Sequence, residues 1–164
     1  MRSTDLPPSA TEIAAMTTQN VAFRRAGFAL LLGVSLQACA APATGSYVEL
    51  KGQRYTIEIA ADDASRAHGL MDRTQMDADH GMLFVFDDDA MRAFWMKNTK
   101  LPLDMLFFDA DRKLVSVQPN VPPCVADPCP AYSSGAPARY VLELNAGQAA
   151  KLGVTSGDEL ILHR

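Results

Sequence analysis

The alternation of apolar and polar positions predicts short β-strands along most of the chain after residue 46. Residues 54–60 alternate, with Tyr55, Ile57 and Ile59 on one face, as in a strand that buries one side. Other short apolar or alternating runs are bounded by Asp, Asn, Pro or Gly: 81–86, 93–98, 105–109, 114–121, 139–144 and 159–162. About seven short strands favour a mainly β fold, a small sandwich or an open barrel, over a parallel α/β sheet.

Two short helices are expected among these strands. Asp62 and Asp63 offer an N-cap and favourable charge to a helix over residues 64–70, and residues 148–152 predict a turn or two of helix that ends at Gly153.

Polar and proline-rich segments predict the connections. The aspartates at 87–89 and those at 109 and 111 indicate turns between neighbouring strands. Asp158 closes a turn before the last strand. Residues 120–137 predict one long proline-rich loop that contains Cys124 and Cys129.

The N-terminal part of the chain has the features of an export signal. Arg24 and Arg25 precede an uncharged stretch, residues 26–36, which is too short to remain as a membrane-spanning helix. Residues 1–38 are therefore predicted to be a signal peptide, and Met16 is the expected start, because residues 1–15 fit neither a signal nor a fold.

The end of this signal resembles the bacterial lipobox. In Leu-Gln-Ala-Cys (36–39), Cys39 would be acylated and become the first mature residue, with 39–46 as a tether and 47–164 as one domain. Acyl chains give stable anchoring, so the membrane is an expected partner. Ala40 resembles the sorting state of outer-membrane lipoproteins, which predicts an exported protein on the periplasmic face of the outer or inner membrane. The alternative is a secreted protein cut near Ala41.

The charge balance argues against one class of partner. After residue 39 the chain carries 12 Lys and Arg against 17 Asp and Glu, with no basic cluster. Binding to a phosphate backbone needs such a cluster, so nucleic acid is not an expected partner.

A series of short motifs resembles one family, the domain of unknown function 192. The motifs are GLMDR (69–73), GMLF (81–84), FWMKNT (94–99), PLD (102–104), Phe108, PC (123–124), VLE (141–143), Gly147 and GD (157–158). The resemblance spans residues 55–162 and implies a mainly β, sandwich-like fold in bacterial proteins that are often exported or membrane-attached. It implies no reaction. Asp72 departs from the bulky apolar residue that often precedes the arginine of the first motif.

Cysteines and methionines raise the possibility of metal binding. In an oxidising compartment Cys124 and Cys129 are expected to form a disulfide, and the histidines lack ligand-like spacing, so neither a metal nor another cofactor is expected. A Cu(I) site built from methionines is the alternative. We favour a core role for the methionines, because Met82 and Met96 alternate beside Phe84 and Phe94.

Trp95 and Lys97 would share one face of the predicted strand at 93–98. If that face is solvent-exposed, Trp95 with Lys97 and Asn98 makes an apolar platform with hydrogen-bond donors, suited to sugars or peptide stems. The alternative, which we favour slightly, buries Trp95 in a second layer with Lys97 reaching the rim.

Arg73, Asp104 and Glu143 are charged residues between apolar neighbours, so partial burial and pairing are expected. The two carboxylates beside a guanidinium could act as acid and base on envelope glycan or peptide, could bind a ligand, or could form a structural ion-pair network. Ser65 and His68 lie in no hydrolase motif.

The leading hypothesis is a non-catalytic envelope module that binds a small polar ligand or envelope component. Its candidate binding residues are Arg73, Trp95, Lys97, Asn98, Asp104 and Glu143. The competing hypotheses are a hydrolase that uses Asp104 and Glu143, and a protein-interaction or structural module with an exposed apolar patch.

Overall fold

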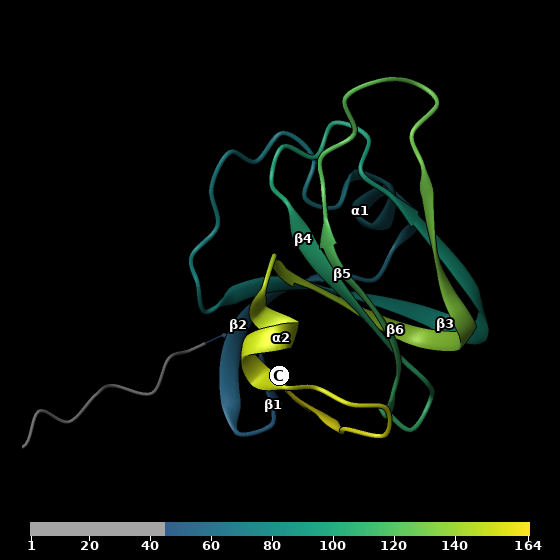
Figure 1. The fold of residues 1–164 in the computed structure, drawn as a ribbon. Helices are drawn as coiled ribbons and strands as arrows, with labels where there is room; N and C mark the ends of the chain where they lie inside the picture. The colour runs from purple at the N-terminus through teal and green to yellow at the C-terminus, as the bar shows by residue number, and fades with distance from the viewer. Residues whose placement is uncertain (1–44) are drawn as a thin grey trace, which may run out of the picture. The chain divides into compact units, whose positions relative to one another are not determined.

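The computed structural model describes residues 45–164; the predicted signal peptide, Cys39 and most of the tether lie outside them. Within this range the chain forms seven strands and two short helices (Figure 1). In chain order these are β1 (Tyr47–Leu50), β2 (Gln53–Ala60), α1 (Asp63–His68), β3 (His80–Trp95), β4 (Leu103–Phe108), β5 (Leu114–Val121), β6 (Ala131–Asn145), α2 (Gln148–Leu152) and β7 (Leu160–His163).

The strands form one sheet in the order β5-β4-β6-β3-β2-β1-β7. Only β2 and β3 pair in parallel among the described strands; α1 and the loop after it make this crossover. The two edge strands approach each other where Lys113 and Glu159 form a bridge and the Leu160 N–H donates to the Arg112 carbonyl at 2.9 Å. The sheet is thus a curled half-barrel, which confirms the expected mainly β fold of the open-barrel type.

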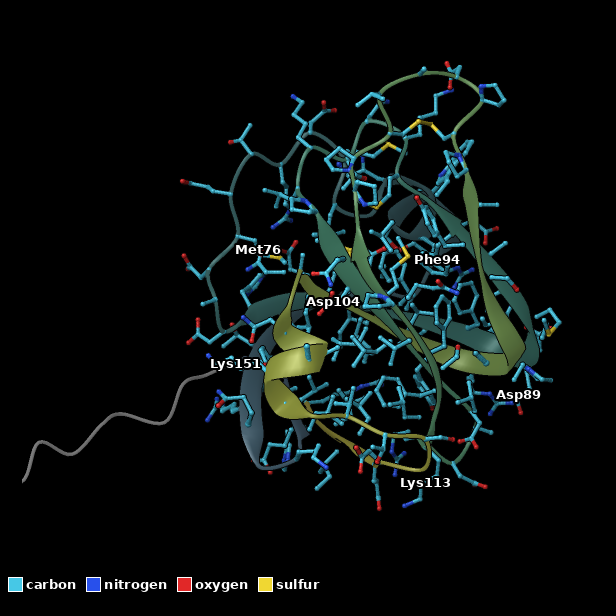
Figure 2. All side chains as sticks on the ribbon, in the orientation of Figure 1. Met76, Asp89, Phe94, Asp104, Lys113 and Lys151 are labelled. Atoms are coloured by element: carbon cyan, nitrogen blue, oxygen red, sulfur yellow. A yellow bond between two sulfur atoms is a disulfide. The ribbon has the colours of Figure 1, made fainter. Side chains whose placement is uncertain are left out.

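The long ribbon of β3 and β6 corrects two sequence predictions. The strand expected at 81–86 and the first three residues of the one expected at 93–98 are parts of the single strand β3, whereas residues 96–98 lie beyond its end. Asp87–Asp89 make an irregular bend inside β3 rather than a turn (Figure 2). The Arg92 side chain holds the bend, because it bonds to Asp88 Oδ1 at 2.6 Å and to the Ala138 carbonyl at 2.9 Å. The ribbon therefore turns a corner and stays paired on both sides of it.

The proline-rich loop is shorter than predicted. Its last part, from Ala131, belongs to β6, so only residues 122–130 connect β5 and β6. This loop contains the disulfide between Cys124 and Cys129, with a Cα–Cα distance of 5.6 Å, as expected from the sequence. The short strand β1, which we did not predict, pairs with both β2 and β7.

Two apolar clusters cover opposite faces of the sheet, and β4 contributes to both because all six of its residues are buried. Leu106 and Phe108 pack with Leu142 and Ala149 on one face, while Met105 and Phe107 pack on the other. Met82 and Met96 are buried in this second cluster, so both have the predicted core role.

The two helices lie well apart at different parts of the sheet (Figure 1). Helix α1 begins with a capping box in which Asp62 and Ser65 exchange hydrogen bonds, as its predicted N-cap requires. In residues 45–164 there is no helix long and apolar enough to cross a membrane.

Candidate functional site

A surface groove lies between the C-terminal part of α1 and the end of β3. Its outer part holds about 260 Å³ and is lined by Arg66, Ala67 and the side of β3 that carries Phe94 and Trp95. Its inner part is a small pocket with about 30 Å³ of space for water-sized groups. The two parts share Arg66, Ala67, Phe84, Phe94 and Trp95, so they adjoin each other.

Glu143 lines the inner pocket and is 96% buried, with 4% of its surface exposed. It lies on β6 opposite Met82 of β3 and Met105 of β4, and so points to the same side of the sheet as these apolar residues. No described residue donates a hydrogen bond to its carboxyl group or forms an ion pair with it. Burial alone raises the pKa of Glu143 from 4.5 to about 8. Near neutral pH the carboxyl group is therefore mostly protonated.

The wall of the groove is aromatic. Phe94 makes edge contacts with Phe84 and Phe107, whose ring centroids lie 5.0 and 5.9 Å away. Trp95 is 53% exposed, which makes our preference for a buried tryptophan wrong. The β3 strand ends at Trp95, and the side chain is left at the mouth of the groove because no second layer covers it in the described structure.

The helix side of the groove is held rigidly. Arg66 donates to the carbonyls of Ala61 and Val85 at 2.6 and 2.9 Å and pairs with Asp63. Gly69 ends α1 with φ at 51°, and a Cβ there would lie 3.2 Å from the Phe84 ring. A glycine at this position thus lets the chain turn and pass closely over the aromatic wall.

Asp104 lies away from this groove. Its neighbour in the register is Leu144, so it points to the face opposite to that of Glu143. Oδ2 accepts a hydrogen bond from the Ala149 N–H at 2.7 Å, and Oδ1 accepts one from the Asn120 N–H at 2.8 Å. Asp104 thereby caps α2 (Figure 2). The pKa of Tyr55 is raised first by the burial of its own hydroxyl group and second by the negative charge of Asp104. The acid/base pair of Asp104 and Glu143 that the hydrolase hypothesis requires does not exist in this fold.

Arg73 is also separate from the groove. It donates to Glu58 Oε2 at 2.5 Å, and His80 bonds to Glu58 Oε1 at 3.0 Å. The Arg73 hydrogen bond is the main reason why the pKa of Glu58 is lowered. These residues form a partly exposed ion-pair group beside another surface depression, which Arg73 and His80 line with residues 75–77.

Lys97 and Asn98 lie next to the groove rather than in it. They line a depression of about 160 Å³ together with the disulfide loop. Lys97 Nζ lies 5.5 Å from the centre of the Trp95 ring, and Asn98 adopts a left-handed turn with φ at 55° and accepts a hydrogen bond from the Asp72 N–H. Lys97 therefore retains the predicted contact with Trp95, although the two do not share a strand.

Of the six candidate residues, the structure brings Glu143 and Trp95 into one pocket, with Lys97 against the tryptophan ring. The sequence patterns did not identify Arg66, Gly69, Phe84 and Phe94 as groove residues. Gly69 and Phe84 belong to the quoted motifs, but a sequence does not reveal that these motifs pack together. Residues 45–164 contain no cluster of His, Cys, Asp and Glu that could hold a metal ion.

Comparison with known proteins agrees with this architecture. A family described as DUF192, Uncharacterized ACR, matches residues 46–162. The crystal structure of a candidate transcription regulator from Sinorhizobium meliloti 1021 is 41% identical, with a TM-score of 0.65 over 71% of this chain and 91% of that one. A protein of unknown function from Novosphingobium aromaticivorans DSM 12444 is 33% identical, with a TM-score of 0.63 over 73% of this chain and 89% of that one. No curated protein matches the chain.

The fold places the protein in a class of small, mainly β domains built on a curled half-barrel sheet. Because the family match covers most of the chain and the solved relatives exceed 30% identity, the protein belongs to the DUF192 family.

Proposed function

We propose that this domain binds a small polar ligand of the cell envelope in the groove between α1 and β3. One observation carries the proposal: a carboxyl group with no hydrogen-bond partner among residues 45–164 lines a pocket that the half-exposed Trp95 also lines. The Glu143 oxygens are not among the fully buried side-chain atoms that lack a partner in the described structure, so the carboxyl group reaches the pocket and a ligand that enters there can bind it.

Trp95 supplies the platform for such a ligand. An exposed indole with an aromatic wall behind it offers a rigid apolar surface to a sugar ring or a peptide stem. Lys97 against the ring adds a charged donor at the rim. Polar recognition at the base and stacking at the mouth together favour a ligand with both polar and apolar faces.

Binding is favoured over hydrolysis by the placement of the acids. Glycoside hydrolysis by acid and base uses two carboxyl groups that flank one bond. Glu143 is the only carboxylate among the residues that line the groove, and Asp104 is on the other face of the sheet with both oxygens bonded.

A protein-interaction role is less favoured, because the large exposed apolar residues are divided among β3 (Met91, Trp95), the disulfide loop (Val125) and β7 (Ile161).

The proposed setting is the bacterial envelope, with the chain exported and attached to the periplasmic face of the outer or inner membrane through acylated Cys39. Two features support it: the signal-like residues 1–38, which lie outside the described part, and the Cys124–Cys129 disulfide. Disulfides persist in oxidising compartments such as the periplasm. The acidic charge of the domain gives no support to nucleic-acid binding, despite the name of the Sinorhizobium relative.

Trp95 is the only tryptophan of the chain, so its fluorescence reports directly on the groove. We expect a saturable fluorescence change when the purified protein is titrated with soluble peptidoglycan fragments. Glu143→Gln should weaken the binding at least about tenfold, which corresponds to the loss of about one hydrogen bond. The matched control is Glu159→Gln, an equal substitution at the Lys113 ion pair, which should bind as the wild type does. The absence of any saturable change would refute the proposal.

A further inference from the structure

The chemistry of the inner pocket restricts which part of a ligand can reach Glu143. Resting on the binding function proposed above, we propose that the group that enters is a primary alkyl ammonium, as in a lysine side chain or a diamino acid of a peptide. Its alkyl stem would then lie along Phe94 and Trp95 in the outer groove.

The size of the two parts of the groove fits this arrangement. The inner pocket has about 30 Å³ of space for water-sized groups, which suits an ammonium group and is too small for a sugar ring or an amino acid. The outer part, with about 260 Å³, can take an apolar stem and the polar body attached to it. A narrow end beneath a wide, aromatic mouth thus matches a thin chain that ends in a small polar head.

The chemistry of the lining also favours a cation. A carboxylate without a partner pairs best with an ammonium group, and the surrounding aromatic rings attract cations through their faces. The charged or titratable groups of the lining besides Glu143 are Arg66 and His68 of α1; none comes from β3 or from the turn at Thr99. Arg66 does not satisfy Glu143, since its guanidinium is bonded to Ala61, Val85 and Asp63.

Entry of an ammonium group should be coupled to the loss of a proton. Burial raises the pKa of Glu143 to about 8, so near neutral pH the group is mainly an acid and must ionise to pair with a cation. An alkyl ammonium keeps its own proton up to about pH 10. The observed affinity should therefore rise with pH until Glu143 is ionised. A neutral carbonyl ligand would show the opposite dependence, because it needs the protonated carboxyl group as a donor.

The test compares two probes that differ at one nitrogen. Nα-acetyl-L-lysine methylamide carries the ammonium, and Nα,Nε-diacetyl-L-lysine methylamide has the same stem with a neutral amide. Binding of each to the wild type, Glu143→Gln and Glu159→Gln is followed at pH 6, 7 and 9 by Trp95 fluorescence and calorimetry. The series is repeated with His68→Gln, because the charged or titratable residues of the pocket lining are Glu143, Arg66 and His68.

We expect the ammonium probe to bind the wild type at least about tenfold more tightly at pH 9 than at pH 6, with close to one proton released per probe at pH 7. Glu143→Gln should abolish this rise, whereas His68→Gln and Glu159→Gln should retain it. The diacetylated probe should bind at least about tenfold more weakly at pH 9.

Two contrary results have different meanings. Equal or tighter binding of the diacetylated probe, with an affinity that falls as pH rises, would overturn the ammonium inference and leave the binding function in place. If neither probe nor the peptidoglycan fragments gave a saturable signal, the proposed function itself would fail together with this inference.

Discussion

Glu143 is an energetic cost to the fold as well as a candidate binding group. Because its pKa is raised by burial, the folded state holds the proton more tightly than the unfolded state does. The stability that comes from holding this proton is fully present below pH 4.5. The free energy of unfolding then falls as the pH rises from 4.5 through about 8, where the buried group must ionise. A residue kept at such a cost in an apolar layer is a typical functional candidate, which agrees with its place at the groove.

Replacing Glu143 with glutamine should stabilise the domain at alkaline pH. Each pH unit between the two pKa values changes the free energy of unfolding by about 1.4 kcal/mol, so the advantage of Glu143→Gln should grow by about 3–4 kcal/mol between pH 5 and pH 8.5. Urea unfolding of both proteins at the two pH values measures this difference and cancels the titration of all other groups. An advantage that does not change with pH would mean that Glu143 is ionised throughout or is not buried in solution.

At the scale of elements, Asp104 connects three segments: it lies on β4 and accepts hydrogen bonds from β5 and from the first turn of α2. Asp104→Ala should lower the free energy of unfolding by about 2–5 kcal/mol, because the N–H groups of Asn120 and Ala149 would lose their charged acceptor. Asp77→Ala, at an exposed position, is the control and should change it by less than about 0.5 kcal/mol. Chemical denaturation measures both. If ligand binding by the folded Asp104→Ala protein were lost while its stability stayed the same, the structural role assigned here would be wrong.

The sequence predicted the elements that depend on local chemistry. The N-cap of α1 at Asp62, the strand β5 and the turn at Asp109, whose carboxylate accepts from the Asp111 and Lys113 N–H groups, were found because their signals lie within a few residues. The bend at Asp87–Asp89 was missed because Arg92 and the carbonyl of Ala138 on another strand decide it. Strand β1 was missed because its four residues are too few to establish alternation.

The candidate site was predicted only in part. Trp95 and Glu143 were identified, but the face of each strand depends on register, which the sequence does not contain. Glu143 pairs with Met105, so the neighbouring Asp104 necessarily points to the other face. Since every residue of β4 is buried, no apolar-polar alternation could reveal which face was which.

At the scale of the whole molecule, the bridge between the sheet edges and the disulfide loop lie far apart. The bridge between Lys113 and Glu159 joins the two edges of the curled sheet at one end, and the disulfide loop projects from the opposite end (Figure 1). Among the described strands the two edges meet only near this bridge, so most of the outer side of β5 and β7 stays unpaired, and the groove is accessible beside α1.

Membrane attachment through Cys39 is the last property that the chain predicts. We expect Cys39→Ala to move the protein from the membrane fraction to the soluble fraction or to leave it as an uncut precursor, because only this cysteine follows the lipobox-like residues 36–38. Fractionation of cells, with mass spectrometry of the mature N-terminus, gives the result. Cys124→Ala is the matched control: it removes a cysteine of the disulfide and should leave the protein in the membrane fraction. Recovery of the wild-type chain as a soluble protein that begins near residue 42 would instead establish plain secretion, with Cys39 discarded together with the signal.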